Sequence, residues 1–190
     1  MTAQDPLALP TDLPVPEDDG AARHLPGSPL PAVELPASDG SRVRLDALGG
    51  RSVVFAYPRT GRPGEPSLGG DAYWDSIPGA RGCTPEVCGI RDSIAGFEAL
   101  GVRVFGLSTQ SSADQAEAAE RLGLPYPLLS DERLSLARSL SLPTFEVEGV
   151  VVLKRLTLLL SDGVVEDVLY PVFPPDQAAA EALRLLQRGA

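Results

Sequence analysis

The chain has 190 residues, enough for one domain with a hydrophobic core. Its 16 basic and 26 acidic residues give a formal net charge of −10, which argues against the basic face of a nucleic-acid-binding protein and against binding to anionic membranes. No apolar run approaches the roughly 20 residues that span a bilayer. The N-terminus has no positive patch followed by an apolar block, so we expect no secretory signal and a cytoplasmic location.

Residues 1–27 are rich in proline and acidic side chains. This composition predicts an extended or disordered N-terminal arm, because it offers little apolar surface to bury. A solvated tail without a specific role is the favoured interpretation. We therefore expect the folded domain to cover residues 28–190.

The domain begins with a hairpin signal, in which two apolar runs flank a Ser-Asp-Gly-Ser turn at 38–41. A buried strand is predicted at 52–57, because this run is apolar, β-branched and aromatic. The next helix is predicted at 84–100, where apolar side chains recur at three- and four-residue steps and Gly101 ends the pattern. The remaining predictions are strands at 102–107, 126–129, 150–160 and 164–170, and helices at 112–122, 131–140 and 175–188.

This order alternates strands and helices in its middle and adds a hairpin turn at 161–163 near its end. Alternation implies parallel strands with crossover helices, and the late hairpin adds antiparallel strands. The predicted fold class is α/β, with a mixed central sheet flanked by helices and an N-terminal β-hairpin, as in thioredoxin-like folds.

An insertion at residues 59–82 interrupts this pattern. Glycine and proline supply nine of its 24 residues, and it holds the only tryptophan, Trp74. Structureless loops of this length are uncommon and often functional. The insertion forms either a lid or wall beside the active site, or a passive surface loop with Trp74 tucked against the body.

The two cysteines, Cys83 and Cys88, are too few for a secreted disulfide framework. With His24 as the only histidine they also make a poor zinc site, which needs four ligands at paired spacings. Thr84 and Pro85 form a helix-start signal, with the threonine as cap, and place Cys83 at a helix N-terminus. Unpaired N–H groups and the positive dipole end there favour a thiolate, the nucleophilic form. The alternative is an inert buried cysteine.

Cys88 follows Cys83 by five residues. Within one intact helix the two Cα atoms would lie about 8.6 Å apart. A disulfide tolerates at most about 7 Å, so these cysteines could bond only if the first helical turn unwinds. The alternative is that Cys88 is inert and that an external thiol resolves Cys83.

The stretch from Gly82 to Asp92 resembles the peroxiredoxins, specifically their Q-type branch, also called bacterioferritin comigratory protein. That branch carries a Gly-Cys-Thr-x-Glu-x-Cys-x-x-Arg-Asp pattern, which this sequence matches at all seven fixed positions. The resemblance extends over roughly residues 25–188 and includes Phe55 to Pro58, Leu128 to Asp131 and the strand around Arg155.

The resemblance implies roles for individual residues. Cys83 would be the peroxidatic cysteine and Cys88 the resolving one. Arg155 would hold the thiolate and polarise the peroxide through charge-assisted hydrogen bonds, Glu86 would orient Arg155, and Pro58 would shield the thiolate from solvent.

One family feature is missing. The family places a threonine or serine three residues before the peroxidatic cysteine, and here that position is Ala80. Thr60 is the first substitute and Ser76 the second. If neither reaches the site, Arg155 and the backbone N–H groups of residues 82–84 must position the peroxide.

The predicted function is a thiol-dependent peroxidase that reduces hydrogen peroxide, organic hydroperoxides or both, forms an intramolecular Cys83–Cys88 disulfide and serves antioxidant defence. It would use a thioredoxin-like or other dithiol reductant and no metal, haem or flavin cofactor. Two alternatives stay open. A protein thiol–disulfide oxidoreductase would favour a Cys-x-x-Cys spacing. A thioredoxin-fold redox sensor or binding module would be oxidised with poor turnover.

Overall fold

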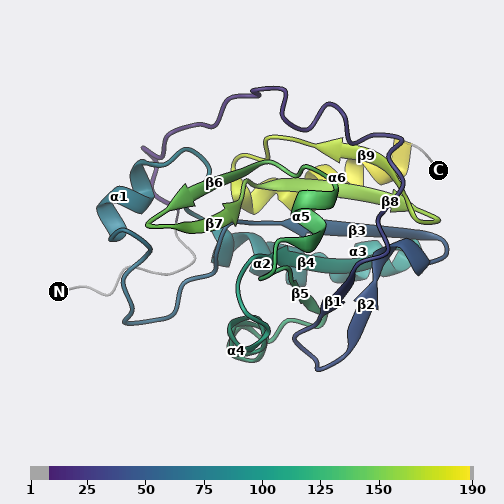
Figure 1. The fold of residues 1–190 in the computed structure, drawn as a ribbon, viewed down its shortest axis with the longest axis horizontal. Helices are drawn as coiled ribbons and strands as arrows, with labels where there is room; N and C mark the ends of the chain where they lie inside the picture. The colour runs from purple at the N-terminus through teal and green to yellow at the C-terminus, as the bar shows by residue number, and fades with distance from the viewer. Residues whose placement is uncertain (1–8, 189–190) are drawn as a thin grey trace.

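The computed structural model describes residues 9–188, and its centre is a five-stranded mixed sheet. The strand order is β5 (Leu128–Ser130), β4 (Arg103–Ser108), β3 (Arg51–Ala56), β8 (Leu156–Ser161) and β9 (Val164–Leu169). β3 pairs in parallel with β4 and antiparallel with β8, and β8 and β9 form an antiparallel pair. The predicted mixed α/β sheet is confirmed (Figure 1).

Two hydrophobic cores lie on opposite faces of this sheet. Successive side chains of β3 point to opposite faces, so Val53 and Phe55 enter one core and Val54 and Ala56 the other. Burial on both faces explains why residues 53–56 of β3 are all apolar instead of alternating.

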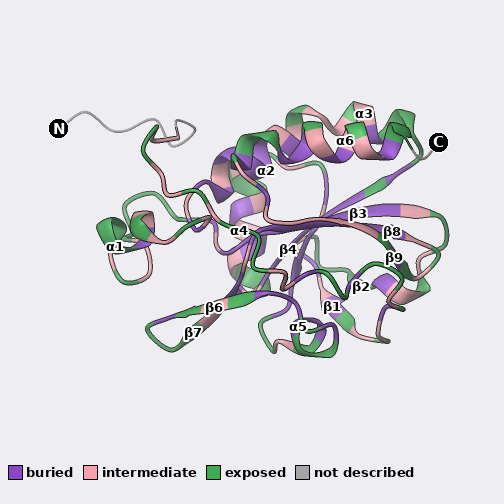
Figure 2. Cartoon of the chain, turned by 90° about the horizontal axis from the view of Figure 1, so that it is seen from above, coloured by how far each residue is buried: buried purple, intermediate pink, exposed green. Residues whose placement is uncertain are grey.

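Helices and a hairpin cover the two faces, as Figure 2 shows. One face is covered by α2 (Cys83–Asp92), α3 (Ile94–Ala99) and α6 (Ala178–Arg188), which follows a 3₁₀ turn at Pro175–Gln177. The other face is covered by α5 (Ser135–Ser139) and the hairpin of β1 (Glu34–Pro36) and β2 (Arg42–Arg44), followed by a 3₁₀ turn at Leu45–Ala47. α4 (Ser112–Leu122) packs beside the edge strand β5. No helix within residues 9–188 is long and apolar enough to cross a bilayer.

The N-terminal hairpin is confirmed, and the helix predicted at 112–122 has the observed bounds. Asp131 accepts hydrogen bonds from the backbone N–H groups of Leu136 and Ala137, at the start of α5. The helix predicted at 84–100 is instead two helices, because Ser93 leaves helical geometry at φ −102° and ψ 2°. The cap of α2 is Gly82, and the side chain of Thr84 does not cap it.

The strand predicted at 150–160 is also divided. Its first part is β7 (Val150–Leu153), which pairs with β6 (Thr144–Val147) in a separate hairpin, and its second part is β8 of the central sheet. Lys154 and Arg155 lie between the two strands and outside both ladders. Two apolar runs separated only by Lys154 and Arg155 therefore belong to different sheets, and the alternation of residue types does not reveal this change of partner.

The insertion at 59–82 contains a short helix, α1 (Asp71–Ser76), which was not predicted. Trp74 on α1 is buried against the β6–β7 hairpin, with its ring centroid 6.0 Å from that of Phe145. Together with Ala80, Val147 and Val152 they form a small satellite core. The insertion is therefore a packed part of the molecule.

Residues 9–27 of the arm lie outside helices and strands, in agreement with an extended segment, but two of them, Ala22 and Leu25, are buried. Figure 1 shows this segment passing from the side of α1 toward β9. Leu25 is fully buried in the core, and the N–H of Gly27 donates to the carbonyl of Val165 at 2.8 Å. The packed unit therefore begins before residue 28, inside the segment assigned to the arm.

Candidate active site

Cys83 lies where the carboxyl end of β3 meets the first turn of α2. It is the first helical residue and is only 3% exposed. Gly82 before it has φ +102°, a conformation that side chains rarely adopt, and this turn directs the chain into the helix. The N–H of Arg59, which follows β3 and Pro58, donates to the Cys83 Sγ at 3.4 Å.

The guanidinium of Arg155 lies beside the sulfur. Its Nη2 is 3.2 Å from the Cys83 Sγ and also donates to the carbonyls of Gly79, Ala80 and Arg81 at 3.1–3.3 Å. These carbonyls belong to the loop that leads into α2, so one cation holds both the loop and the thiol. The thiol in turn contacts the Ala80 carbonyl at 3.6 Å.

Glu86 forms a buried ion pair with Arg155. It is on the first turn of α2, three residues after Cys83, and its carboxylate accepts from the Arg155 Nη1. Both side chains are at most 1% exposed. Within the described chain, the second carboxylate oxygen and the Arg155 Nε have no hydrogen-bond partner. The pair compensates the buried charge of Arg155 and leaves its Nη2 directed at the sulfur.

Pro58 is buried between β3 and the insertion. Its carbonyl accepts a hydrogen bond from the Ser108 hydroxyl at 3.0 Å, which ties the end of β3 to the end of β4. This contact fixes the segment that presents the Arg59 N–H to the thiol.

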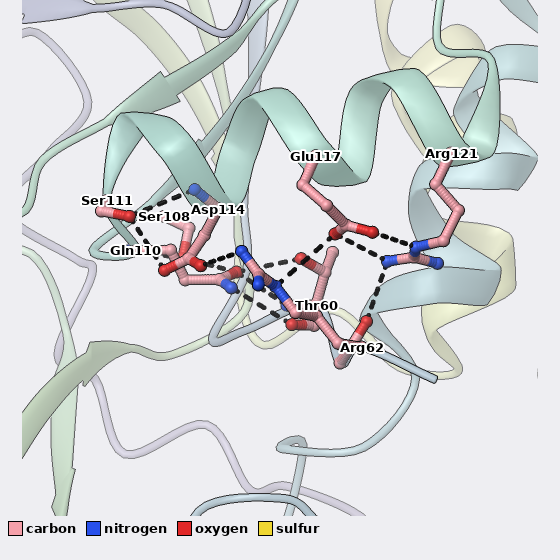
Figure 3. A network of polar contacts seen from close by, with 9 residues as sticks. Thr60, Arg62, Ser108, Gln110, Ser111, Asp114, Glu117 and Arg121 are labelled. Atoms are coloured by element: carbon pink, nitrogen blue, oxygen red, sulfur yellow. Dashed lines mark hydrogen bonds and ion pairs between the residues drawn. The ribbon is translucent and has the colours of Figure 1, made fainter. Parts of the chain in front are cut away.

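Thr60 and Ser76, the two substitutes for the missing family hydroxyl, do not bond Cys83. The Thr60 hydroxyl donates to the Gln110 Oε1 at 3.1 Å, and Figure 3 shows Thr60 and Gln110 within a polar network at α4. The Thr60 N–H donates to the same oxygen at 2.8 Å, so this side chain holds the insertion against the β4–α4 loop. The exposed Ser76 hydroxyl donates to the Tyr73 carbonyl at 2.6 Å. In this arrangement the Thr60 hydroxyl donates to Gln110 and not to Cys83, and its role toward the peroxide stays a prediction.

Cys88 lies in the same helix as Cys83, and both thiols are free. It is buried, with 4% exposure. Burial raises the pKa of the Cys88 thiol, because the charged form loses its hydration. In the folded helix Cys88 is therefore kept protonated and apart from Cys83.

Two parts of the site were missed from the sequence. One is the Arg59 N–H. This is a backbone donor that does not depend on the side chain at position 59, so the sequence does not indicate it. The other is the set of carbonyls at 79–81 that bind Arg155, since backbone acceptors leave no signature in side-chain types. Their only trace in the sequence is their place directly before Cys83.

The chain that carries this site is similar to proteins of a known family. The Redoxin family model matches residues 25–185. The chain is 30% identical over 162 residues to the chloroplastic peroxiredoxin Q of Oryza sativa subsp. japonica, covering 85% of this chain and 66% of the rice protein. It is likewise 30% identical to the chloroplastic peroxiredoxin Q of Sedum lineare, of which it covers 77%.

Solved structures show the same relationship. The peroxidoxin BcpB from Mycobacterium tuberculosis superposes with a TM-score of 0.69 at 29% identity, over 87% of this chain and 98% of that one. A cysteine-to-serine mutant of the Xanthomonas campestris peroxiredoxin Q superposes with a TM-score of 0.66 at 25% identity, over 85% and 96% of the two chains. With its cysteine helix, its thioredoxin-like sheet and these matches, the chain belongs to the Redoxin family as a peroxiredoxin of the Q type.

Proposed function

We propose that this protein is a thiol-dependent peroxidase in which Cys83 attacks a hydroperoxide and Cys88 resolves the product. The observation that carries the proposal is the pair of donors on the Cys83 sulfur, from the Arg155 Nη2 and the Arg59 N–H, at the start of α2. Both donors stabilise negative charge on sulfur, and the helix dipole acts in the same direction.

In the first step, the Cys83 thiolate attacks the terminal oxygen of the hydroperoxide. An S–O bond forms as the O–O bond breaks, and the leaving oxygen takes the bonding electron pair and a proton to become water or an alcohol. Sulfur is oxidised to a sulfenic acid. Arg155 stabilises the charge that develops on the departing oxygen, because it is already fixed by Glu86 and needs no reorganisation.

In the second step, the first turn of α2 unwinds. The Cys88 thiolate then attacks the Cys83 sulfur, an S–S bond forms, and the sulfenic oxygen leaves as water. A dithiol such as a thioredoxin-like protein reduces the disulfide by exchange. Two free thiols within one intact helix are the arrangement that the proposal expects before peroxide reacts.

Peroxide consumption with a dithiol donor tests the proposal. Cys83→Ser is expected to abolish consumption, whereas Cys88→Ser is expected to form the sulfenic acid once and to lose the disulfide. Consumption that persists in Cys83→Ser would refute the first step. Peptide mass mapping of the oxidised wild type that finds no Cys83–Cys88 bond would refute the second.

A further inference from the structure

Arg155 occupies a break between two strands. Lys154 and Arg155 lie after β7 and before β8, so neither sheet ladder fixes their backbone. Two backbone hydrogen bonds hold them instead: the Lys154 N–H donates to the Pro143 carbonyl at 2.8 Å, and the Val172 N–H donates to the Arg155 carbonyl at 3.4 Å. The position of Arg155 therefore depends on the segments beside it.

One carboxylate of the N-terminal arm joins these two segments. Asp19 accepts from the Lys154 Nζ at 2.6 Å and from the Tyr170 hydroxyl at 2.8 Å. Lys154 directly precedes Arg155, and Tyr170 lies two residues before Val172. The contact with Lys154 is the main cause of a lowered Asp19 pKa, so this carboxylate is ionised at neutral pH.

The arm also reaches the other end of the Arg155 side chain. Pro16 packs against Gly79, where a Cβ atom would lie 3.5 Å from the proline ring. The Gly79 carbonyl is one of the acceptors of the Arg155 Nη2. Arm residues 15–17 and 19 line a cavity of about 430 Å³ that Gly79 and Arg155 also line.

We propose that Asp19 is a positioning residue for Arg155, which it holds in place against Cys83 by joining Lys154 and Tyr170. This inference rests on the proposed function for its effect on turnover. Asp19 lies outside residues 25–185, the part that the Redoxin family model matches. Asp19 touches no reacting atom and acts only through the placement of the guanidinium.

The test uses the full chain in a Cys88→Ser background, with hydrogen peroxide as substrate and single-turnover formation of the Cys83 sulfenic acid as readout. Asp19→Asn is expected to slow this step about tenfold, because small displacements of a positioning group are costly to the reaction rate. Asp19→Glu keeps the carboxylate and is expected to recover most of the rate, which a general loss of stability would not explain.

Asp18→Asn is the matched control. It removes the same charge from the neighbouring residue, whose carboxylate contacts neither Lys154 nor Tyr170 and accepts only the Gly20 N–H at 2.8 Å. We expect its rate to equal that of the parent. Lys154→Met is also expected to slow the step, and the double variant is expected to be no slower than Asp19→Asn, because the Lys154 contact already depends on the Asp19 carboxylate.

A second readout separates this inference from the proposed function. Alkylation of Cys83 by iodoacetamide needs the thiolate that Arg155 holds, but no peroxide. Slower alkylation in Asp19→Asn, together with a parent that does not react with peroxide, would support the positioning role and refute the peroxidase. Unchanged rates of both reactions in Asp19→Asn would overturn the positioning role alone. Equal decreases in these rates in Asp19→Asn and Asp18→Asn would also overturn the positioning role.

Discussion

At the scale of single residues, the site depends on one guanidinium whose N–H donors bind different partners. The Nη1 of Arg155 serves Glu86, and its Nη2 serves the Cys83 sulfur and three carbonyls. A planar group with several fixed donors can do this, whereas the single ammonium of a lysine cannot reach both sides at once. The carboxylate of Glu86 is what makes a fully buried cation tolerable.

Glu86→Gln is expected to lower the free energy of unfolding by about 3 kcal/mol or more, because it leaves Arg155 buried without a compensating charge. Urea denaturation measures this change. The control is Glu117→Gln, since Glu117 pairs with Arg121 and both side chains are partly exposed. We expect the control to cost at most about 0.5 kcal/mol. Equal costs in the two variants would contradict the account of the buried pair.

The protonation of Cys88 gives a pH-dependent prediction. Because burial raises the pKa of Cys88, its thiolate is scarcer at any given pH than that of an ordinary thiol, whose pKa is about 8.5. In Cys83→Ser, the rate of Cys88 alkylation by iodoacetamide should therefore rise with a midpoint above that value. In urea the midpoint should fall to the ordinary range. A folded-state midpoint at or below the unfolded one would show that Cys88 is not desolvated.

Most of the chemistry-bearing residues could be found from the sequence, because side-chain type and spacing reveal them. Cys83, Glu86 and Cys88 lie in one short motif, and Arg155 follows from its family position. Thr60 shows the limit of such reasoning, because a hydroxyl near the site in sequence bonds Gln110 instead. A tertiary partner decides where a hydroxyl points, and spacing carries no information about that partner.

At the scale of elements, the start of α2 is a crowded junction. Gly82 has φ +102°, and a Cβ there would lie 2.6 Å from the Pro175 ring and 2.9 Å from a Leu9 methyl. The glycine thus permits both the turn and the close approach of two other segments. This packing surrounds the turn that would open in the proposed cycle, in which Cys83 and Cys88 bond.

Gly82→Ala is expected to lower the free energy of unfolding by about 3 kcal/mol, since it adds steric overlap to an unfavourable backbone conformation. Gly101→Ala is the control: its φ is +65°, and a Cβ there would meet nothing within 4 Å. The control is expected to cost about 1 kcal/mol, from backbone conformation alone. Urea denaturation measures the free energy of unfolding of both variants, and the difference between their losses is the steric contribution at Gly82. Equal losses of stability in the two variants would show that the junction is not crowded.

The helix at 112–122 was predictable because it is rich in alanine, glutamate and glutamine, which favour helices. The structure adds a capping serine, Ser111, whose hydroxyl accepts the Asp114 N–H. The division of 150–160 into β7 and β8 could not be predicted, because both parts are equally apolar and differ only in their partners. Helix α1 is short and surrounded by glycines, so its stability comes from the burial of Trp74 rather than from local propensity.

At the scale of the whole molecule, the arm completes the domain. The composition of residues 1–27 predicted a solvated tail, because proline and acidic residues dominate it. An average composition does not show that a few apolar side chains of the segment are buried. Ala22 and Leu25 belong to the core on the face of α5, with Leu35 and Leu158. The family match also begins at residue 25, which is one of these two buried residues.

Leu25→Ala is therefore expected to lower the free energy of unfolding by about 3 kcal/mol, because it removes a fully buried side chain and leaves a cavity. The control is Val15→Ala, in the same arm, since Val15 is 64% exposed and its loss should cost at most about 0.5 kcal/mol. Urea denaturation of both variants gives the two values. A solvated arm would make both substitutions neutral, whereas a large effect at Leu25 alone would show that the folding unit includes the end of the arm.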